Sequence, residues 1–255
     1  EKTILSAMAL QKGEAEAGEI FRESPEHLHD YTILKGVNSY AALGRYYLAN
    51  ETTVPEELYE YMDLDALGYA LCIIDSGADH ADLTPEYDAI PREMREVAAC
   101  FGKTVLREVE EADVLRELPR LRKAVGDRAV LRALHFFADD RRVEEETAAL
   151  AGGDMDAFLS LVKASGLSSW TLLQNIAPTG AVKEQAMAVA LAVAERALKG
   201  RGACRVHGGG FAGTIQAFVP LELLDGFREQ VESVLGTGSC HVLRLRPVGG
   251  VVLWS

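Results

Sequence analysis

The sequence predicts an α+β domain in which an antiparallel sheet layer is covered by helices. The last third of the chain follows the order strand, loop, strand, helix, strand, which favours antiparallel pairing of neighbouring strands. A continuous apolar run at 69–75 has the length of a buried strand. Helical patterns fill the stretch between this run and the last third of the chain. We expect the helices to lie on one face of the sheet.

The first strand and the helices that follow it are predicted from local signals. The run Tyr69–Asp75 reads YALCIID and ends at Ser76-Gly77, which indicates a buried strand leading into a loop. Pro91 fits the first turn of a helix, because proline has no amide hydrogen to lose there. A long helix is expected from about Asp127, on an apolar stripe, until Gly152-Gly153 stops it.

The second half of the chain continues with helices and then returns to strands. Asp154 is typical of an N-cap, since its carboxylate can accept a hydrogen bond from the first turn, and predicts a helix through about Ala164. The alanine-rich stretch Val182–Leu198 predicts a thin helix that packs close to its neighbour. The remaining expected elements are a strand at Ala203–His207, a strand at Thr214–Val219, an amphipathic helix from Leu221 to Val231, and a strand at His241–Leu245.

The distribution of charge divides the chain near residue 66. Residues 1–66 hold 5 Lys+Arg against 13 Asp+Glu, so this quarter carries −8 of the formal net charge of −13. We therefore expect two domains. The first is an acidic, mainly helical segment at 1–66, and the second is the α+β domain at 67–255.

Charge and hydropathy also limit the partners of the chain. A net charge of −13 disfavours nucleic acid, which binds through lysine and arginine. No apolar stretch reaches the roughly 18 to 20 residues of a membrane span, and no basic-then-apolar leader opens the chain. The scattered Cys72, Cys100, Cys204 and Cys240 are typical of reduced core thiols. We expect a cytoplasmic protein that binds neither membrane nor nucleic acid.

The run Gly200–Gly213, GRGACRVHGGGFAG, places six glycines in fourteen residues. Glycine loses more conformational entropy on folding than any other residue, so a backbone that approaches another group closely best explains this cluster. Amides that turn inward could bind phosphate or another anion. A tight turn between packed elements is the alternative. The candidate loop residues are Gly208, Gly209, Gly210, Phe211 and Gly213.

Other polar constellations predict less. Cys204 and His207 lie three apart on an expected strand and so face opposite sides of the sheet, which argues against a shared zinc ion. The polar cluster at 75–82 is too close in sequence for the geometry of a hydrolytic triad. We predict no metal site. Tyr87 lies between a strand and a helix and is either a packing aromatic or a hydroxyl that faces a ligand.

Three separated segments, in family order, resemble the C-terminal part of galactokinase, a member of the GHMP small-molecule kinases. They begin GYALCIIDSGADHADLTPEYDAIP, DRAVLRALHFFADDRRVEEETAALAGGDMDAF and GRGACRVHGGGFAGTIQAFVP, and the resemblance spans about Leu58 to Gly249. It implies the fold of the GHMP C-terminal domain. It also implies that His207–Gly213 is the third GHMP motif, a glycine loop that lines the active site, and that Tyr87 matches the tyrosine that contacts galactose.

Three further signatures of the family are missing from the sequence. They are a sugar-binding motif containing GEHTDY, a phosphate loop like GLSSSA, and a GxxDQ segment with the catalytic aspartate. In addition, LSSWTLLQNIAPTGA replaces the usual segment resembling RDDYEVS, and Ala212 stands where the family usually has glycine. Phosphoryl transfer depends on positioning and charge stabilisation, so we expect this chain to lack the ATP-binding lobe and assign no catalytic residue.

The resemblance implies a sugar kinase that, as a complete enzyme, uses ATP and Mg²⁺ to convert galactose to galactose 1-phosphate. The expected partner is a small-molecule sugar, and the sequence assigns no oligomeric state. Two alternatives stay open: a GHMP kinase for another small molecule, and a non-catalytic sugar-binding or sensor protein.

Overall fold

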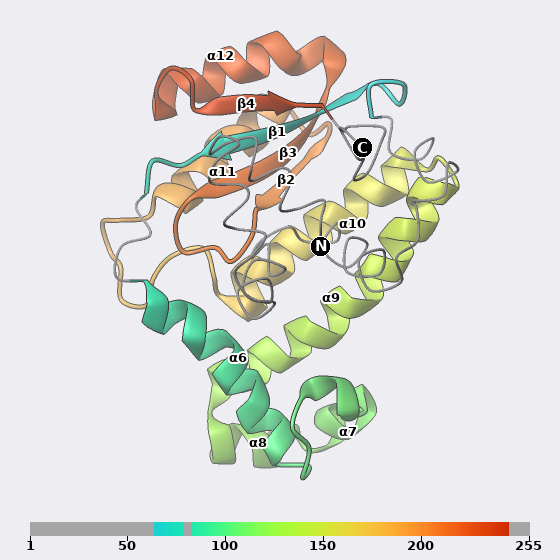
Figure 1. Cartoon of the computed structure of the whole chain (residues 1–255), viewed down its shortest axis with the longest axis vertical. Helices are drawn as coiled ribbons and strands as arrows, with labels where there is room; N and C mark the ends of the chain where they lie inside the picture. Colours follow the sequence, from blue (N-terminus) through green and yellow to red (C-terminus); the bar gives the residue numbers. More distant parts are fainter. Residues whose placement is uncertain (1–63, 79–82, 245–255) are drawn as a thin grey trace, which may run out of the picture. The chain divides into compact units, whose positions relative to one another are not determined.

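The computed structural model describes residues 64–78 and 83–244, and Leu64–Arg244 form one compact unit (Figure 1). A four-stranded antiparallel sheet with helices makes it an α+β fold, which confirms the fold class expected from the sequence. Residues 1–63 lie outside the described part, so the division into two domains at residue 66 stays a prediction. No helix among the described residues is long and apolar enough to cross a bilayer.

The sheet consists of β1 (Tyr69–Asp75), β2 (Ala203–Val206), β3 (Thr214–Pro220) and β4 (Cys240–Leu243). The strands lie in the order β2-β3-β1-β4, and every neighbouring pair is antiparallel. Asp75 pairs with Thr214, so the end of β1 lies beside the start of β3. The loop between β2 and β3 therefore lies at the end of the sheet where β1 also ends.

Helices supply the remaining layers. They are α6 (Thr84–Ala99), α7 (Glu111–Arg116), α8 (Leu118–Val125), α9 (Asp127–Ala151), α10 (Met155–Ser168), α11 (Ala186–Leu198) and α12 (Leu224–Leu235), with short 3₁₀ turns at Leu106–Glu108 and Leu221–Leu223 and a π-helical turn at Ser169–Leu173. The predicted N-cap is confirmed, because the Asp154 carboxylate accepts a hydrogen bond from the amide of Ala157 at 2.9 Å.

Both faces of the sheet are covered, so the expectation of helices on one face is wrong. Helices α11 and α12 pack on one face of the sheet and form the first apolar core with it, in which Ile74, Val206 and Ile215 are fully buried. On the other face α10 crosses β2, and Phe158 of α10 packs edge-on against Phe218 of β3. The alanine-rich helix α11 packs on only one face of the sheet. Apolar residues on the opposite face, such as Phe218, are buried by α10.

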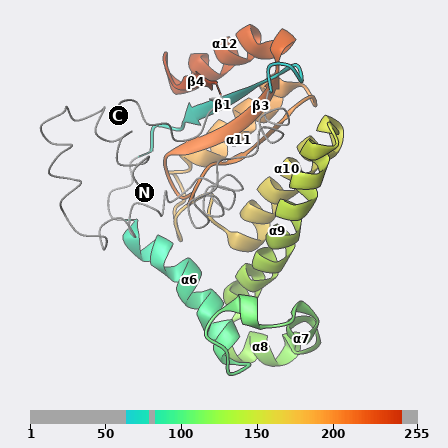
Figure 2. The ribbon, with the colours of Figure 1, turned by 45° about the vertical axis from the view of Figure 1, so that its right-hand side comes forward.

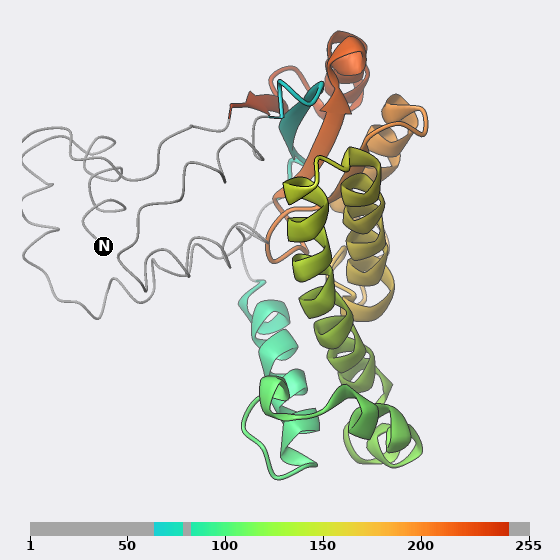
Figure 3. The same cartoon turned by 90° about the vertical axis from the view of Figure 1, so that its right-hand side faces the viewer.

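A second apolar core lies among α6, α7, α8 and α9, with Val97, Val114 and Leu121 fully buried. Figures 2 and 3 show α9 and α10 side by side, with α6 packed on α9. The expected helix start at Pro91 is wrong. Pro85 occupies the first turn of α6, and Pro91 lies inside the helix, where it has no amide hydrogen to donate to the carbonyl of Tyr87.

Candidate functional site

The loop between β2 and β3 holds most of the residues predicted to form a site. His207 donates its amide to the Thr214 carbonyl at 3.0 Å and closes the base of the loop. The Gly213 carbonyl accepts from the amide of Ser76 at 2.9 Å, which joins the loop to the end of β1. Gly208 and Gly210 have φ values of 76° and 82°, in the left-handed region that favours glycine. We call residues 208–213 the glycine loop.

Two of these glycines lie against other parts of the chain. A Cβ on Gly209 would lie 2.8 Å from Cε1 of Tyr87. A Cβ on Gly210 would lie 2.0 Å from the backbone oxygen of Asn175, which is far inside van der Waals contact. The close approach inferred from the glycine cluster is therefore present at both positions, and the neighbours that require it are Tyr87 and Asn175.

Tyr87, from the first turns of α6, reaches the glycine loop across 123 residues of sequence. Its hydroxyl donates to the Gly210 carbonyl at 2.8 Å, and its ring meets the Phe211 ring edge-on with 5.4 Å between centroids. Burial raises the pKa of the Tyr87 phenol, so the hydroxyl keeps its proton at neutral pH and remains a donor. The structure thus brings together the tyrosine and the loop that the sequence singled out separately.

Phe211 sits in a strained turn at the centre of the glycine loop. Its φ is 62°, although it is not glycine, and its side chain is buried. The amide of Ala212 donates to the Gly210 carbonyl at 2.7 Å, which closes a three-residue turn around Phe211. Such turns are rare, and a bulky left-handed residue costs on the order of 1–3 kcal/mol unless its surroundings hold it in place.

Asn175 is a contributor that the sequence did not reveal. Its backbone oxygen accepts from the amide of Phe211 at 2.6 Å, and its side-chain Nδ2 donates to the Gly209 carbonyl at 3.1 Å. The residue is 2% exposed. Nothing in its local sequence distinguishes it from a loop asparagine, because its partners lie more than thirty residues away in the chain.

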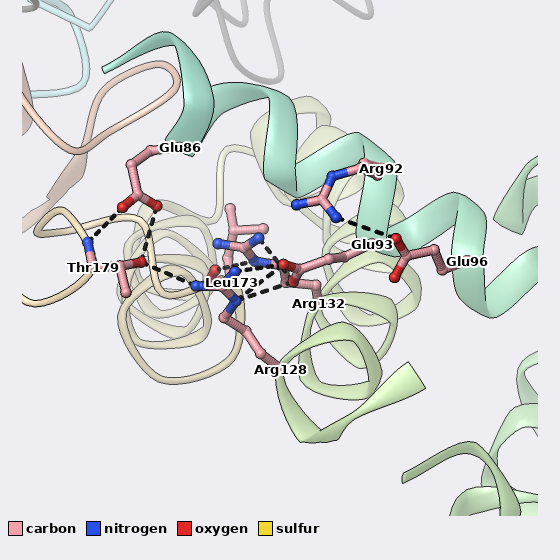
Figure 4. Close-up of polar contacts among 8 residues, drawn as sticks. All are labelled: Glu86, Arg92, Glu93, Glu96, Arg128, Arg132, Leu173 and Thr179. Atoms are coloured by element: carbon pink, nitrogen blue, oxygen red, sulfur yellow. Dashed lines mark hydrogen bonds and ion pairs between the residues drawn. The ribbon is translucent and has the colours of Figure 1, made fainter. Parts of the chain in front are cut away.

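A network of ion pairs and hydrogen bonds anchors the segment around Asn175 (Figure 4). Glu93 of α6 accepts from Arg132 Nη1 of α9 at 2.9 Å and from Arg128 Nε at 3.1 Å. Arg132 is fully buried and donates Nε to the Leu173 carbonyl at 3.1 Å. Desolvation by burial lowers the pKa of Arg132, while Glu93 opposes this effect by favouring the charged form.

The same network continues to the loop beyond Asn175. Glu86, next to Tyr87, accepts from the Thr179 amide at 2.7 Å and from its hydroxyl at 3.0 Å. Arg128 Nη1 also donates to the Thr179 hydroxyl at 3.0 Å. Helix α6 is thus tied to the stretch 173–179 at two points, and it presents Tyr87 from the same end.

His207 and a separate hollow contribute less to the site. His207 Nδ1 lies 3.0 Å from the Thr214 hydroxyl, and burial and the nearby Arg205 lower the pKa of its imidazole, so the ring is neutral at neutral pH.

A hollow of about 590 Å³ lies at the opposite end of the sheet, beside Tyr69 and Pro220. Its charged lining mixes both signs, with Lys163 and Arg201 against Asp156 and Glu222, and includes none of the residues predicted for a site.

Metal-ligating side chains do not cluster among the residues that the structure describes. No group of three or more His, Cys, Asp or Glu side chains that could hold a metal occurs in residues 64–78 and 83–244. Two amides of the glycine loop are already bonded, that of Phe211 to Asn175 and that of Ala212 to Gly210. These two amides are therefore not free to bind an anion in this conformation of the loop.

Galactokinases of several bacteria are similar to this chain in sequence. The chain is 30% identical over 161 residues to a galactokinase of Actinobacillus pleuropneumoniae serotype 3, covering 63% of this chain and 40% of that protein. The galactokinase of Glaesserella parasuis serovar 5 is 30% identical over 164 residues, covering 64% and 41%. That of Thermotoga petrophila is 33% identical over 107 residues, covering 42% and 28%. The chain is similar to part of galactokinase.

A solved structure extends the galactokinase likeness to the fold. Lactococcus lactis galactokinase, in a structure titled as a complex with galactose, superposes with a TM-score of 0.56 at 22% identity, covering 72% of this chain and 46% of that one. No family model matches the sequence. The resemblance to galactokinase inferred from three sequence segments is confirmed, and the chain spans less than half the length of these galactokinases.

Proposed function

We propose that this chain is the sugar-facing part of a galactokinase-like kinase, in which Tyr87 and the glycine loop form one wall of the galactose site. The observation that carries the proposal is the hydrogen bond from Tyr87 to Gly210, which joins two residues that the galactokinase resemblance assigns to the same site. In the complete enzyme, ATP and Mg²⁺ would be bound by residues beyond those described, and the product would be galactose 1-phosphate.

The chemistry of this wall suits positioning. Because the phenol donates its one proton to the Gly210 carbonyl, it can only accept hydrogen bonds from other groups, so a sugar hydroxyl would act as the donor to it. The Phe211 ring packed on Tyr87 fixes the orientation of the phenol. Since phosphoryl transfer gains most of its rate from holding the reactants in line, orienting the sugar is the contribution that these residues would make. The proposed setting is the cytoplasm, with no role for nucleic acid.

Calorimetry with galactose tests this proposal on the chain as it is. We expect Tyr87→Phe to weaken galactose binding by about 1 kcal/mol, roughly fivefold, the usual loss for one neutral hydrogen bond. Tyr69→Phe is the matched control, because Tyr69 begins β1 at the other end of the sheet, and it should leave binding unchanged. Equal binding by the parent and Tyr87→Phe would refute the role of Tyr87, and absence of galactose binding by the parent would refute the sugar site.

The two alternatives are separated by turnover of the complete enzyme, because we expect this chain to lack the ATP-binding lobe. A kinase for another small molecule would phosphorylate a non-sugar and leave galactose untouched when both are offered with ATP and Mg²⁺. A non-catalytic sugar-binding protein would give heat with galactose and no phosphorylated product. The proposed function of the complete enzyme is supported only if galactose is the substrate that is consumed.

A further inference from the structure

We propose that Asn175 is a positioning residue that holds the glycine loop in its strained turn and thereby sets the Tyr87 wall of the site. This role deepens the proposed function and rests on it, since the loop that Asn175 holds is the one that would line the galactose site. Asn175 itself would touch no substrate.

The contacts of Asn175 bracket Gly210 on both sides along the chain. The backbone oxygen of Asn175 accepts from the amide of Phe211, one residue after Gly210, at 2.6 Å. Its side-chain Nδ2 donates to the carbonyl of Gly209, one residue before, at 3.1 Å. Asn175 thus fixes both peptide groups that flank Gly210, at the start of the turn.

The side chain of Asn175 is held by its donor alone. Its Oδ1 is buried and has no hydrogen-bond partner among the described residues. The amide NH₂ is therefore the group that matters, and aspartate, which has nearly the same shape, cannot provide it when ionised. A carboxylate there would also place a negative charge against the Gly209 carbonyl, which repels it.

The segment that delivers Asn175 is braced at both ends by buried arginines. The π-helical turn Ser169–Leu173 follows α10, and π turns occur frequently at functional sites. Arg205 of β2 donates to the Ser169 hydroxyl at 3.4 Å, and Arg132 of α9 donates to the Leu173 carbonyl at 3.1 Å. Gln174 then takes a left-handed φ of 58°, which turns the chain toward the glycine loop.

The two residues that contact the glycine loop share one support. Glu93 of α6 binds Arg132, which donates to the Leu173 carbonyl in the turn before Asn175 (Figure 4). The same helix carries Tyr87. Tyr87 and Asn175 are thus held relative to each other through α6 and α9. A strained residue such as Phe211 keeps its conformation only where its surroundings over-determine it, and these two contacts supply that constraint.

Amide hydrogen exchange tests the positioning role without any ligand. We expect the amides of Phe211 and Ala212 to exchange about tenfold faster in both Asn175→Asp and Asn175→Ala, because loss of the brace lets the turn open locally. The amides shared by β1 and β3 should keep their parent rates. Gln174→Glu is the matched control: it makes the same change from amide to carboxylate one residue earlier, on an exposed side chain, and should leave the loop rates unchanged.

Two results would overturn the role of Asn175. One is loop exchange in both Asn175 variants at the rates of the parent. The other is an equal increase at the β1 and β3 amides, which would mean that Asn175 supports the whole fold instead of the loop. If neither variant folds, the parent decides: the side-chain amide protons of Asn175 should exchange much more slowly than those of Gln174, and equal rates would contradict the hydrogen bond to Gly209.

Calorimetry then links Asn175 to the site. We expect Asn175→Asp to weaken galactose binding about fivefold while Gln174→Glu binds like the parent. Unchanged binding in a variant whose loop exchange has increased would contradict the positioning role. A parent that binds no galactose would count against the proposed function, while the exchange result would still decide whether Asn175 braces the loop.

Discussion

Two regions of the molecule are held together by different interactions. One is the apolar core between the sheet and helices α11 and α12, and the other is the glycine loop with its neighbours. In the core, fully buried apolar side chains such as Ile74 and Ile215 pack without directional bonds. At the loop, the conformation depends on two hydrogen bonds from Tyr87 and Asn175 and on a strained Phe211. The comparison teaches that apolar burial determines the core, whereas directional hydrogen bonds determine the geometry of the loop.

The largest loss of stability is expected from the core side of the comparison. Phe227 of α12 is 1% exposed, and Phe227→Ala should lower the free energy of unfolding by about 3–5 kcal/mol through lost burial and the cavity left behind. Urea unfolding measures this. Val234 lies on the same helix but is 57% exposed, so Val234→Ala should change the free energy of unfolding by less than about 0.5 kcal/mol. Similar losses for the two variants would contradict this view of the core.

The next largest effect is expected at Gly210. Gly210→Ala should destabilise by about 2–4 kcal/mol, since its Cβ would overlap the Asn175 carbonyl oxygen in addition to straining a φ of 82°. Gly238→Ala isolates the backbone cost, because its φ is 84° and a Cβ there would meet no atom within 4 Å. Urea unfolding should show a larger loss of unfolding free energy for Gly210→Ala than for Gly238→Ala. Equal losses would show that Asn175 can move away from the added Cβ without cost.

Acid should weaken the fold through a histidine outside the loop. His135 of α9 lies within hydrogen-bond distance of the Ser168 hydroxyl, 2.9 Å from Nδ1, and burial lowers its pKa to about 4 despite the attraction of Asp139. Arg205 and Arg142 also face it and act in the same direction as burial. The unfolded chain therefore takes up this proton first, near pH 6.5, and stability falls between about pH 6.5 and pH 4.

The size of this acid effect can be isolated by substitution. His135 should account for up to about 3 kcal/mol of the loss by pH 4, and His135→Gln should remove that part of the slope in urea unfolding measured from pH 7 to pH 4. An unchanged slope in the variant would show that His135 is not buried as a neutral ring.

The smallest effect is expected at Ala212. This residue is buried in the loop without a left-handed φ, so Ala212→Gly, which restores the residue usual in galactokinases, should cost at most about 1 kcal/mol of backbone entropy. Thermal unfolding measures it. A loss as large as that of Gly210→Ala would remove the distinction between close-approach glycines and the rest of the loop.

Sequence predicted the elements whose signals are local. The apolar run of β1, the N-cap at Asp154 and the glycine stops of α9 each depend on a few adjacent residues, and each lies where expected. The start of α6 was misplaced because Pro85 and Pro91 give the same local signal, and only tertiary packing of the first two turns distinguishes them.

The support of the site could not be predicted in the same way. Tyr87 and the glycine loop were singled out from the galactokinase resemblance and the glycine density, whereas Asn175, Glu93 and Arg132 carry no local signal. Their partners lie between 34 and 41 residues away in the chain. Such contacts are determined by how α6, α9 and the π-helical turn pack, which periodicity and spacing do not encode.

The most direct test of the central claim is a galactose titration followed by NMR of the backbone amides and tyrosine rings. If Tyr87 and the glycine loop form a wall of the sugar site, the signals of Gly209, Gly210 and the Tyr87 ring should shift saturably, while those of Tyr69 and of α12 stay in place. Saturable shifts confined to other parts of the chain, or none at all, would contradict the account.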